Sequence, residues 1–204
     1  MSKQPQDRLT PKVFNSGTDL AEVAEEVANI ANGYYPMNAN REDVIGLSQT
    51  GCAALIALHD QKRLVGFATI VAVNQEGYKR FIQGTIFGIG RKSYPTNALP
   101  YHGDSLGSYF ILDMMIAPKY RNSLAWLHLM SEAATLLRNI AKNDNAVLAA
   151  LSDPKTGCRQ YSLCLGMVSS KKYSFGDVCE TTTGKFFGAV SDVEYPLLAD
   201  LVEA

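Results

Sequence analysis

Residues 109–121 read YFILDMMIAPKYR, and this stretch decides the fold. The apolar run over 109–116 predicts a buried strand, which Pro118 ends because proline cannot donate to a strand ladder. The residues that follow predict a long helix over about 123–142, with apolar side chains at the spacing of one helical face. A second apolar run over 146–151 predicts another buried strand. Because such a helix can cross back over the sheet, we expect the two strands to be adjacent and parallel.

Upstream of this stretch, the sequence predicts helices and then strands. In order, the expected elements are helices over about 19–32 and 41–48, strands over 52–59 and 63–73, and a strand within 78–89. Asn40 should cap the second helix, with Asp43 at the third position inside it. The linker Asp60-Gln61-Lys62 makes the first two strands a hairpin. Prolines and glycines interrupt residues 90–108, which we expect to form a long inserted loop.

Downstream, the sequence predicts a mixture of helices and closing strands. The expected elements are a helix over about 156–165, strands over 167–175 and 185–190, and a terminal helix over 192–202. Residues 1–17 are polar and contain Pro5 and Pro11, so we expect a flexible N-terminal segment, followed by a single domain over 18–204. The predicted fold class is α/β, with a mixed central sheet and helices on both faces.

The composition excludes several classes of protein. The chain has 204 residues, of which 47% are hydrophobic, so it can bury a sizeable core. Its formal net charge of −1 does not provide the basic excess that nucleic-acid binding requires. The polar start resembles no secretory signal, and no apolar run is long enough for a membrane span. The four cysteines form no C-x-x-C pair, so we expect reduced thiols and a cytoplasmic location.

Two segments carry a resemblance to a known family. Ile116, Pro118, Tyr120 and Arg121 match in type and spacing the V-x-P-x-Y-R pattern that ends a strand in the GCN5-related N-acetyltransferase (GNAT) superfamily. In residues 161–167, the sequence YSLCLGM is similar to the family's helix that ends in an L-G-F signature. The resemblance implies an acetyltransferase-like mixed sheet, in which the two buried strands splay apart at one end. It covers about residues 18–190.

The resemblance also implies a function and a site. It implies an acyl-CoA-dependent N-acyltransferase, using acetyl-CoA or another acyl-CoA and an amine of a small molecule or a protein, and it leaves room for a homodimer. The amine attacks the thioester directly while a base takes its proton and an acid protonates the leaving thiolate. Asp113 is the candidate base and Tyr161 the candidate acid. The candidate cofactor-binding residues are Met115, Ile116, Arg121, Asn122, Ser123, Leu124, Ala125 and Trp126.

The sequence departs from the family at two places. The family has glycines three and five residues beyond its arginine, where the backbone approaches phosphate closely; here those positions hold Leu124 and Trp126. Ser162 stands where the family has its acid, one residue from Tyr161. These departures motivate two alternatives. One is an inactive acetyltransferase-like binding or inhibitory module, and the other is an acyl-transferring synthase of a signal molecule.

Some candidate residues have a structural alternative. Asp113 interrupts an apolar strand. It is either a general base or a hydrogen-bonded structural aspartate. His102 and Asp104 lie in the inserted loop. They either bind the substrate or belong to a plain turn. Trp126 packs on the cofactor or in the core. The three histidines and the cysteines show no metal-ligand spacing, so we expect no metal.

Overall fold

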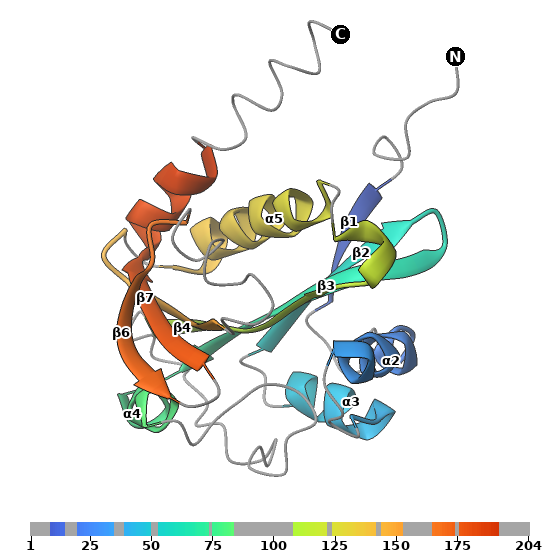
Figure 1. Ribbon diagram of the computed structural model, residues 1–204, viewed down its shortest axis with the longest axis horizontal. Coiled ribbons are helices and arrows are strands. Elements are labelled where there is room, and N and C mark those ends of the chain that lie inside the picture. The colour runs from blue at the N-terminus through green and yellow to red at the C-terminus, as the bar shows by residue number, and fades with distance from the viewer. Residues whose placement is uncertain are drawn as a thin grey trace, which may run out of the picture.

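A seven-stranded mixed sheet forms the centre of the computed structural model (Figure 1), with the strand order β1-β2-β3-β4-β5-β7-β6. The structure describes residues 9–14, 20–34, 39–49, 53–73, 75–83, 108–121, 124–141, 144–152, 165–173 and 176–191. The strands are β1 (Leu9–Phe14), β2 (Ala53–Asp60), β3 (Arg63–Val73), β4 (Ser108–Ile116), β5 (Val147–Ser152), β6 (Val168–Tyr173) and β7 (Gly176–Thr182). Neighbouring strands pair antiparallel, except that β4 and β5 are parallel.

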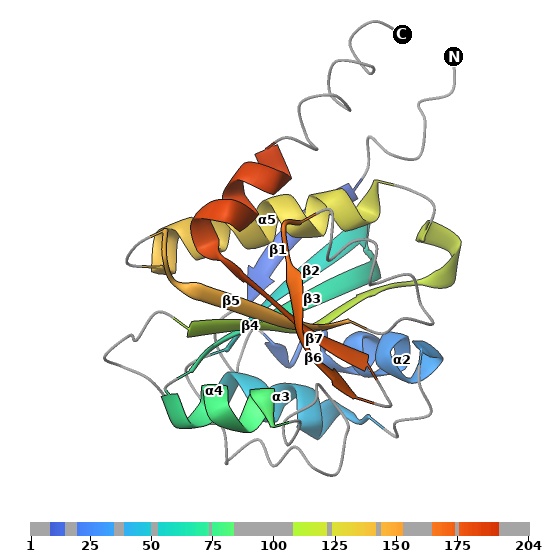
Figure 2. The same cartoon turned by 60° about the vertical axis from the view of Figure 1, so that its left-hand side comes forward.

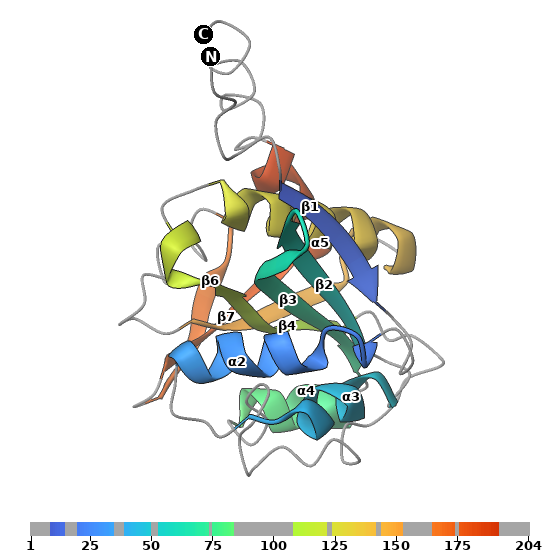
Figure 3. The same cartoon turned by 90° about the vertical axis from the view of Figure 1, so that its right-hand side faces the viewer.

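Helices cover both faces of the sheet, as the sequence predicts. The helices are α2 (Ala24–Tyr34), α3 (Arg41–Gln49), α4 (Gln75–Ile82), α5 (Ala125–Ile140) and one over 183–191, with a short 3₁₀ helix, η3 (Pro118–Tyr120). One face, which we call the α5 face, carries α5 and residues 183–191. The other, the α2 face, carries α2, α3 and α4 (Figures 2 and 3). Each face buries its own cluster of apolar side chains, so the sheet is the middle of three layers.

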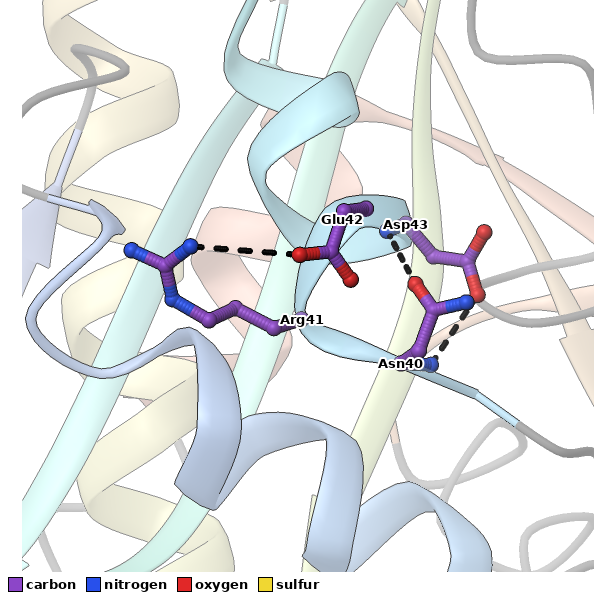
Figure 4. A network of polar contacts seen from close by, with 4 residues as sticks. All are labelled: Asn40, Arg41, Glu42 and Asp43. Carbon is purple, nitrogen blue, oxygen red and sulfur yellow. Dashed lines mark hydrogen bonds and ion pairs between the residues drawn. The ribbon is translucent and has the colours of Figure 1, made fainter.

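The predicted start of α3 is confirmed in detail. Asn40 Oδ1 accepts a hydrogen bond from the Asp43 N–H at 2.9 Å, and Asp43 Oδ2 accepts one from the Asn40 N–H at 3.0 Å (Figure 4). This reciprocal pair satisfies two backbone donors at the helix start. Arg41 and Glu42 lie beside it as an exposed ion pair of 3.9 Å, which adds little stability.

Most of the expected strands and the long helix are confirmed. β3 has the predicted bounds, and β2, β4, β5 and α5 differ from theirs by one or two residues. The hairpin between β2 and β3 turns through Gln61, whose φ of 59° is the left-handed conformation of a tight turn. The first helix is shorter than expected, because residues 21–23 form a turn before α2 begins at Ala24.

The strand expected within residues 78–89 is wrong where the structure describes it. Residues 75–82 form α4 instead. Tyr78 and Ile82, one helical turn apart, both pack against the α2-face core, whereas Lys79 and Arg80 between them are exposed. Aromatic and β-branched content suggested a strand, but the spacing of the buried residues is helical.

The strand expected over 185–190 is also wrong, because these residues belong to the helix over 183–191. Phe186, Phe187 and Val190 face the α5-face core at helical spacing. Thr182 Oγ1 accepts a hydrogen bond from the Lys185 N–H at 3.3 Å, the geometry of an N-cap. The closing strand is β7, which lies between this helix and the correctly predicted β6.

Two further differences concern the chain ends and the inserted loop. Residues 9–14 were expected to be flexible, but they form β1, and every residue of β1 pairs with a residue of β2. Val13 and Phe14 hold β1 in place because they pack into the two cores. Three expectations lie outside the described residues: most of the loop at 90–108, the helix over 156–165 up to residue 164, and the terminal helix over 192–202. In the part of the chain that the structure describes, no helix is long and apolar enough to cross a membrane.

Candidate active site

The two parallel strands at the centre of the sheet part at their carboxyl ends. β4 and β5 pair from Ser108–Val147 to Ile111–Ala150. Beyond that point β4 continues to Ile116 against β3, and β5 continues to Ser152 against β7. The predicted adjacent and parallel arrangement, with strands splayed at one end, is therefore confirmed.

A bulge in β4 coincides with this parting. In the β3–β4 register Ile111 pairs with Ile70 and Asp113 with Thr69, so Leu112 is an extra residue on β4. An extra residue bends its strand and increases the local twist. The bulge thus accounts for β4 turning away from β5 immediately after Ile111.

The turn after β4 is held by several hydrogen bonds. The Ala117 N–H donates to Val65 O at 2.8 Å, and the Tyr120 N–H donates to Ala117 O at 2.8 Å. The Tyr120 hydroxyl donates to Asp60 Oδ2 at 2.6 Å, which ties η3 to the end of β2. That bond, followed by burial, raises the pKa of Tyr120 above its ordinary value. The start of the turn is therefore fixed against the β2–β3 hairpin.

The predicted cofactor-binding residues lie along this turn and the first turn of α5. Arg121 is exposed, and its Nε donates to Ile116 O at 3.4 Å. Leu124 is the N-cap position of α5 and half-buried, Ala125 is buried, and Trp126 is half-buried against the α5-face core. Met115 and Ile116 are buried at the end of β4. Asn122 and Ser123 lie outside the described residues.

The candidate base, Asp113, lies on the α2 face beside a threonine. Phe67 and Val71 belong to the α2-face core, so Thr69 between them points to the same side of β3. Asp113 pairs with Thr69 across the strands and precedes Met114, which packs on the α5 face, so Asp113 also points to the α2 face. Thr69 is 1% exposed and Asp113 8% exposed. Tyr161, His102 and Asp104 lie outside the residues that the structure describes.

Helix α4 covers the α2 face next to this position. Tyr78 stacks on Phe110 of β4, with ring centroids 5.9 Å apart and an interplanar angle of 26°. The Tyr173 hydroxyl of β6 donates a hydrogen bond to Ile82 O at the end of α4. The helix therefore spans from β4 to β6 and brings aromatic rings to the carboxyl side of β5.

Glu180 of β7 is a second carboxyl on the α2 face, which the sequence analysis did not single out. It pairs with Ala149 and lies two residues from Val178 of the α2-face core. Burial raises the pKa of Glu180 above its ordinary value of 4.5. In the sequence, Glu180 stands out only as an acidic residue between Val178-Cys179 and Thr181-Thr182. Thr69 was missed because it lies within the apolar run of β3.

Replacing Glu180 with glutamine should make the protein more stable at neutral pH and leave its stability at pH 4 nearly unchanged. A raised carboxyl pKa in the folded state means that stability is complete below 4.5 and is lost as the pH rises through the raised pKa. Glutamine has the same shape as glutamate but cannot ionise, so the variant does not lose stability as the pH rises through the raised pKa. Thermal unfolding from pH 4 to 8 measures it. A parallel offset of the two curves at every pH would contradict this explanation.

Among the described residues, no group of three or more histidine, cysteine or carboxylate side chains could hold a metal ion. Cys179, the one cysteine within the described ranges, is buried and forms no disulfide.

Comparisons with known proteins find likeness in structure only. No protein-family model matches the chain, and no curated protein sequence does. A solved structure assigned to the GNAT acetyltransferases, from Desulfovibrio desulfuricans, is 10% identical with a TM-score of 0.56, covering 86% of this chain and 99% of that one. FeeM, an N-acyl amino acid synthase from uncultured soil microbes, is 11% identical with a TM-score of 0.60, covering 88% and 93%.

A third similar structure is that of Arabidopsis thaliana NAA60 in complex with acetyl-CoA. It is 14% identical with a TM-score of 0.54, covering 85% of this chain and 97% of that one. These likenesses, together with the parallel pair that parts before η3 and α5, show that the chain has the fold of the GCN5-related N-acetyltransferases.

Proposed function

We propose that the chain is a divergent member of this superfamily and transfers an acyl group from an acyl-CoA, such as acetyl-CoA, to an amine of a small molecule or a protein. The observation that carries the proposal is the parting of β4 from β5 directly before η3 and α5. The same fold binds acetyl-CoA in NAA60 and coenzyme A in PaiA N-acetyltransferase from Thermoplasma acidophilum. We propose a cytoplasmic location, where thiols such as Cys179 stay reduced.

The residues at the turn fit an acyl-CoA through charge more than through close backbone approach. Leu124 and Trp126 have side chains where glycine would let phosphate reach the backbone. The exposed guanidinium of Arg121 can meet a phosphate, with Lys119 beside it, near the amino end of α5. Backbone N–H groups of β4 near Ile116 would polarise the thioester carbonyl.

The α2 face supplies the acceptor side of the proposed reaction. The acyl-CoA provides the thioester, and a C–N bond to the amine forms as the C–S bond breaks. The Asp113 carboxylate takes one proton from the amine, and its burial keeps bulk water from this carboxylate. Tyr161 remains the proposed donor of a proton to the thiolate sulfur, and His102 and Asp104 remain proposed acceptor-binding residues.

Calorimetric titration with acetyl-CoA and with longer acyl-CoAs tests the proposal. We expect heat with a dissociation constant in the micromolar range, about 8 kcal/mol of binding free energy. A lack of heat with every acyl-CoA would reject the transferase.

The variant Arg121→Ala should weaken acyl-CoA binding about ten- to a hundredfold. A charged hydrogen bond contributes roughly 1.5–3 kcal/mol, and Arg121 lies in the turn directly before α5, which begins at Ala125. The measurement is the dissociation constant of acetyl-CoA by calorimetry. Arg41→Ala is the matched control, because Arg41 is an exposed arginine on α3 at the opposite face (Figure 4) and should leave the constant unchanged.

A second variant, Trp126→Gly, tests whether the indole obstructs the proposed phosphate site. Trp126 packs on the α5-face core, so its removal should lower the melting temperature. If glycine there instead tightens binding, the indole obstructs the phosphates. If wild type binds acetyl-CoA and Arg121→Ala binds equally well, the proposed placement of the phosphates is wrong.

Two observations favour second candidates on the same scaffold. Leu124 and Trp126 at the phosphate turn favour an inactive binding or inhibitory module, which would give no heat with any acyl-CoA. The likeness in fold to FeeM, an N-acyl amino acid synthase, is the reason to keep an acyl-transferring synthase of a signal molecule as the other candidate. Tighter binding of long-chain than of acetyl-CoA would support that synthase, because each buried methylene contributes about 0.8 kcal/mol.

A further inference from the structure

Thr69 and Asp113 are two polar side chains side by side inside an apolar layer. They are direct partners in the antiparallel register of β3 and β4, and both point to the α2 face. Opposite residues in such a pair have Cβ atoms about 4.5–5.5 Å apart. Their neighbours on that face are apolar, with Phe67 and Val71 flanking Thr69 along β3. The pair lies beside the bulge at which β4 leaves β5.

The threonine hydroxyl lacks an explanation in the folding of β3. Thr69 is 1% exposed, and its Oγ1 has no hydrogen-bond partner among the residues that the structure describes. Leaving a buried hydroxyl unsatisfied costs about 1–3 kcal/mol, whereas valine has the same shape without that cost. The other side chains of β3 from Phe67 to Val73 are all apolar. A hydroxyl at this one position therefore points to a requirement of the site.

We infer that Thr69 is a positioning residue for Asp113, whose ionised carboxylate receives a hydrogen bond from the threonine hydroxyl. The inference rests on the proposed function and deepens it. In the structure the Thr69 hydroxyl makes no hydrogen bond to a described residue, and a rotation about χ1 or one buried water would connect it to the carboxylate over the cross-strand distance. The hydroxyl keeps its own proton throughout. The carboxylate is held toward the acceptor and takes the amine proton as the C–N bond forms.

The consequence is a shift in the pH at which Asp113 takes up its proton. A hydrogen bond donated to the ionised form favours that form, so its loss should move the protonation midpoint of Asp113 upward. We expect a rise of about one pH unit in Thr69→Val, roughly tenfold in proton affinity. Thr69→Ser keeps the donor and should restore the midpoint.

Several other charged side chains lie on the elements around the pair. The charged or titratable side chains on the elements that carry or pack against this face are Lys12 of β1, His59 and Asp60 of β2, Arg63 of β3, Glu25 and Glu26 of α2, Arg41, Glu42 and Asp43 of α3, Lys79 and Arg80 of α4, Lys171 and Lys172 of β6, and Asp177 and Glu180 of β7. Asp43 is engaged in its capping pair, and Asp177 alternates to the α5 face. Glu180 lies two strands from β4, about 10 Å in strand spacing. His59 and Asp60 are half-buried at the hairpin end of β2, at least four residues from Leu55, the β2 residue that pairs with Thr69, and Asp60 accepts the hydrogen bond from Tyr120. The remaining charged side chains are exposed, so water screens them.

The experiment follows the carboxyl ¹³C resonance of Asp113 with pH in aspartate-labelled protein, identified by its disappearance in Asp113→Asn. The set is wild type, Thr69→Val, Thr69→Ser and Glu180→Gln. Thr69→Ala is the second variant without a hydroxyl. A higher midpoint in Thr69→Val and Thr69→Ala, restored in Thr69→Ser, is the expected result. A midpoint that is equal in all the Thr69 variants overturns the inference, and melting temperatures confirm that each variant is folded.

Two further readouts separate this inference from the proposed function. With acetyl-CoA and the fastest acceptor of a panel of primary amines, the acidic limb of kcat/KM should shift with the NMR midpoint, while the dissociation constant of acetyl-CoA stays unchanged. A shifted midpoint without any acyl-CoA binding leaves the Thr69–Asp113 pair standing and rejects the transferase. Acyl transfer with an unshifted midpoint and an unshifted acidic limb rejects the pair and leaves the transferase standing.

Discussion

Asp113→Asn should lower kcat/KM for acyl transfer by roughly 10²- to 10⁴-fold, the usual contribution of a positioned general base. Asparagine has the same shape as aspartate but cannot accept the amine proton. The side chain is buried beside the parting of β4 and β5, so no bulk water replaces it in that role. The binding of acyl-CoA should be unaffected, because we propose that the phosphates bind at η3 and the start of α5. Steady-state kinetics and calorimetry on the same samples measure the two effects.

The control separates the base from a structural aspartate. Asp144→Asn changes an exposed carboxylate in the turn before β5, and it should leave both the rate and the melting temperature near those of wild type. If Asp113→Asn loses several degrees of melting temperature and keeps its rate per folded molecule, the carboxylate is structural and the base lies elsewhere. Glu180 would then be the next candidate, since it shares the α2 face.

Phe110→Ala should reduce the free energy of unfolding by about 3–5 kcal/mol. Phe110 is 0% exposed and stacks on Tyr78, so it joins β4 to α4 through the α2-face core. Alanine leaves a cavity between the sheet and a helix of only eight residues. Denaturant unfolding monitored by circular dichroism gives the change.

A matched variant tests whether this cost comes from burial. Val168→Ala on β6 removes apolar atoms from a residue that is 69% exposed, and it should cost less than about 0.5 kcal/mol. The loss of unfolding free energy in Phe110→Leu should lie between those of the other two variants, because leucine fills part of the cavity that alanine leaves. A cost below 1 kcal/mol for Phe110→Ala would mean that α4 does not pack on β4 in solution.

The elements that the sequence predicts well are those with a local signal. The apolar runs of β3, β4 and β5 are uninterrupted and lie between turn residues, and the Asn40–Asp43 pair marks a helix start by itself. The helices that were missed, α4 and residues 183–191, are short and rich in aromatic residues, which have strand propensity in isolation. Their helical state depends on which residues find the core, and that depends on the rest of the sheet. β1 was missed for the same reason, since its pairing partner lies more than forty residues away in sequence, from Leu9 with Asp60 to Phe14 with Leu55.

The candidate site was predictable only where a family pattern reached it. Ile116, Pro118, Tyr120 and Arg121 indicated the end of β4 and the turn, and the structure places that turn where the pattern expects it. Asp113 stood out because it interrupts an apolar run. Thr69 carries no such mark, because a threonine is ordinary in a strand, and Glu180 is marked only as an acidic residue among apolar and threonine residues. Their relation to Asp113 follows from strand register and the bulge, which are tertiary features.

Among the strands that the structure describes, β1 and β6 are the edges of the sheet, and their composition bears on how the protein behaves at high concentration. An exposed edge can pair with the edge of another molecule and begin aggregation. β1 carries Pro11, which has no N–H to donate, and Lys12, while β6 carries exposed Lys171 and Lys172. Lys171 and Lys172 give the β6 edge a positive charge that opposes the approach of a second β6 edge, whereas Lys12 is paired with Glu22 at 3.6 Å. On the β1 edge it is the proline that interrupts any added ladder. With a net charge of only −1, the molecule has little overall repulsion to keep copies apart, so colloidal stability depends on these few edge residues.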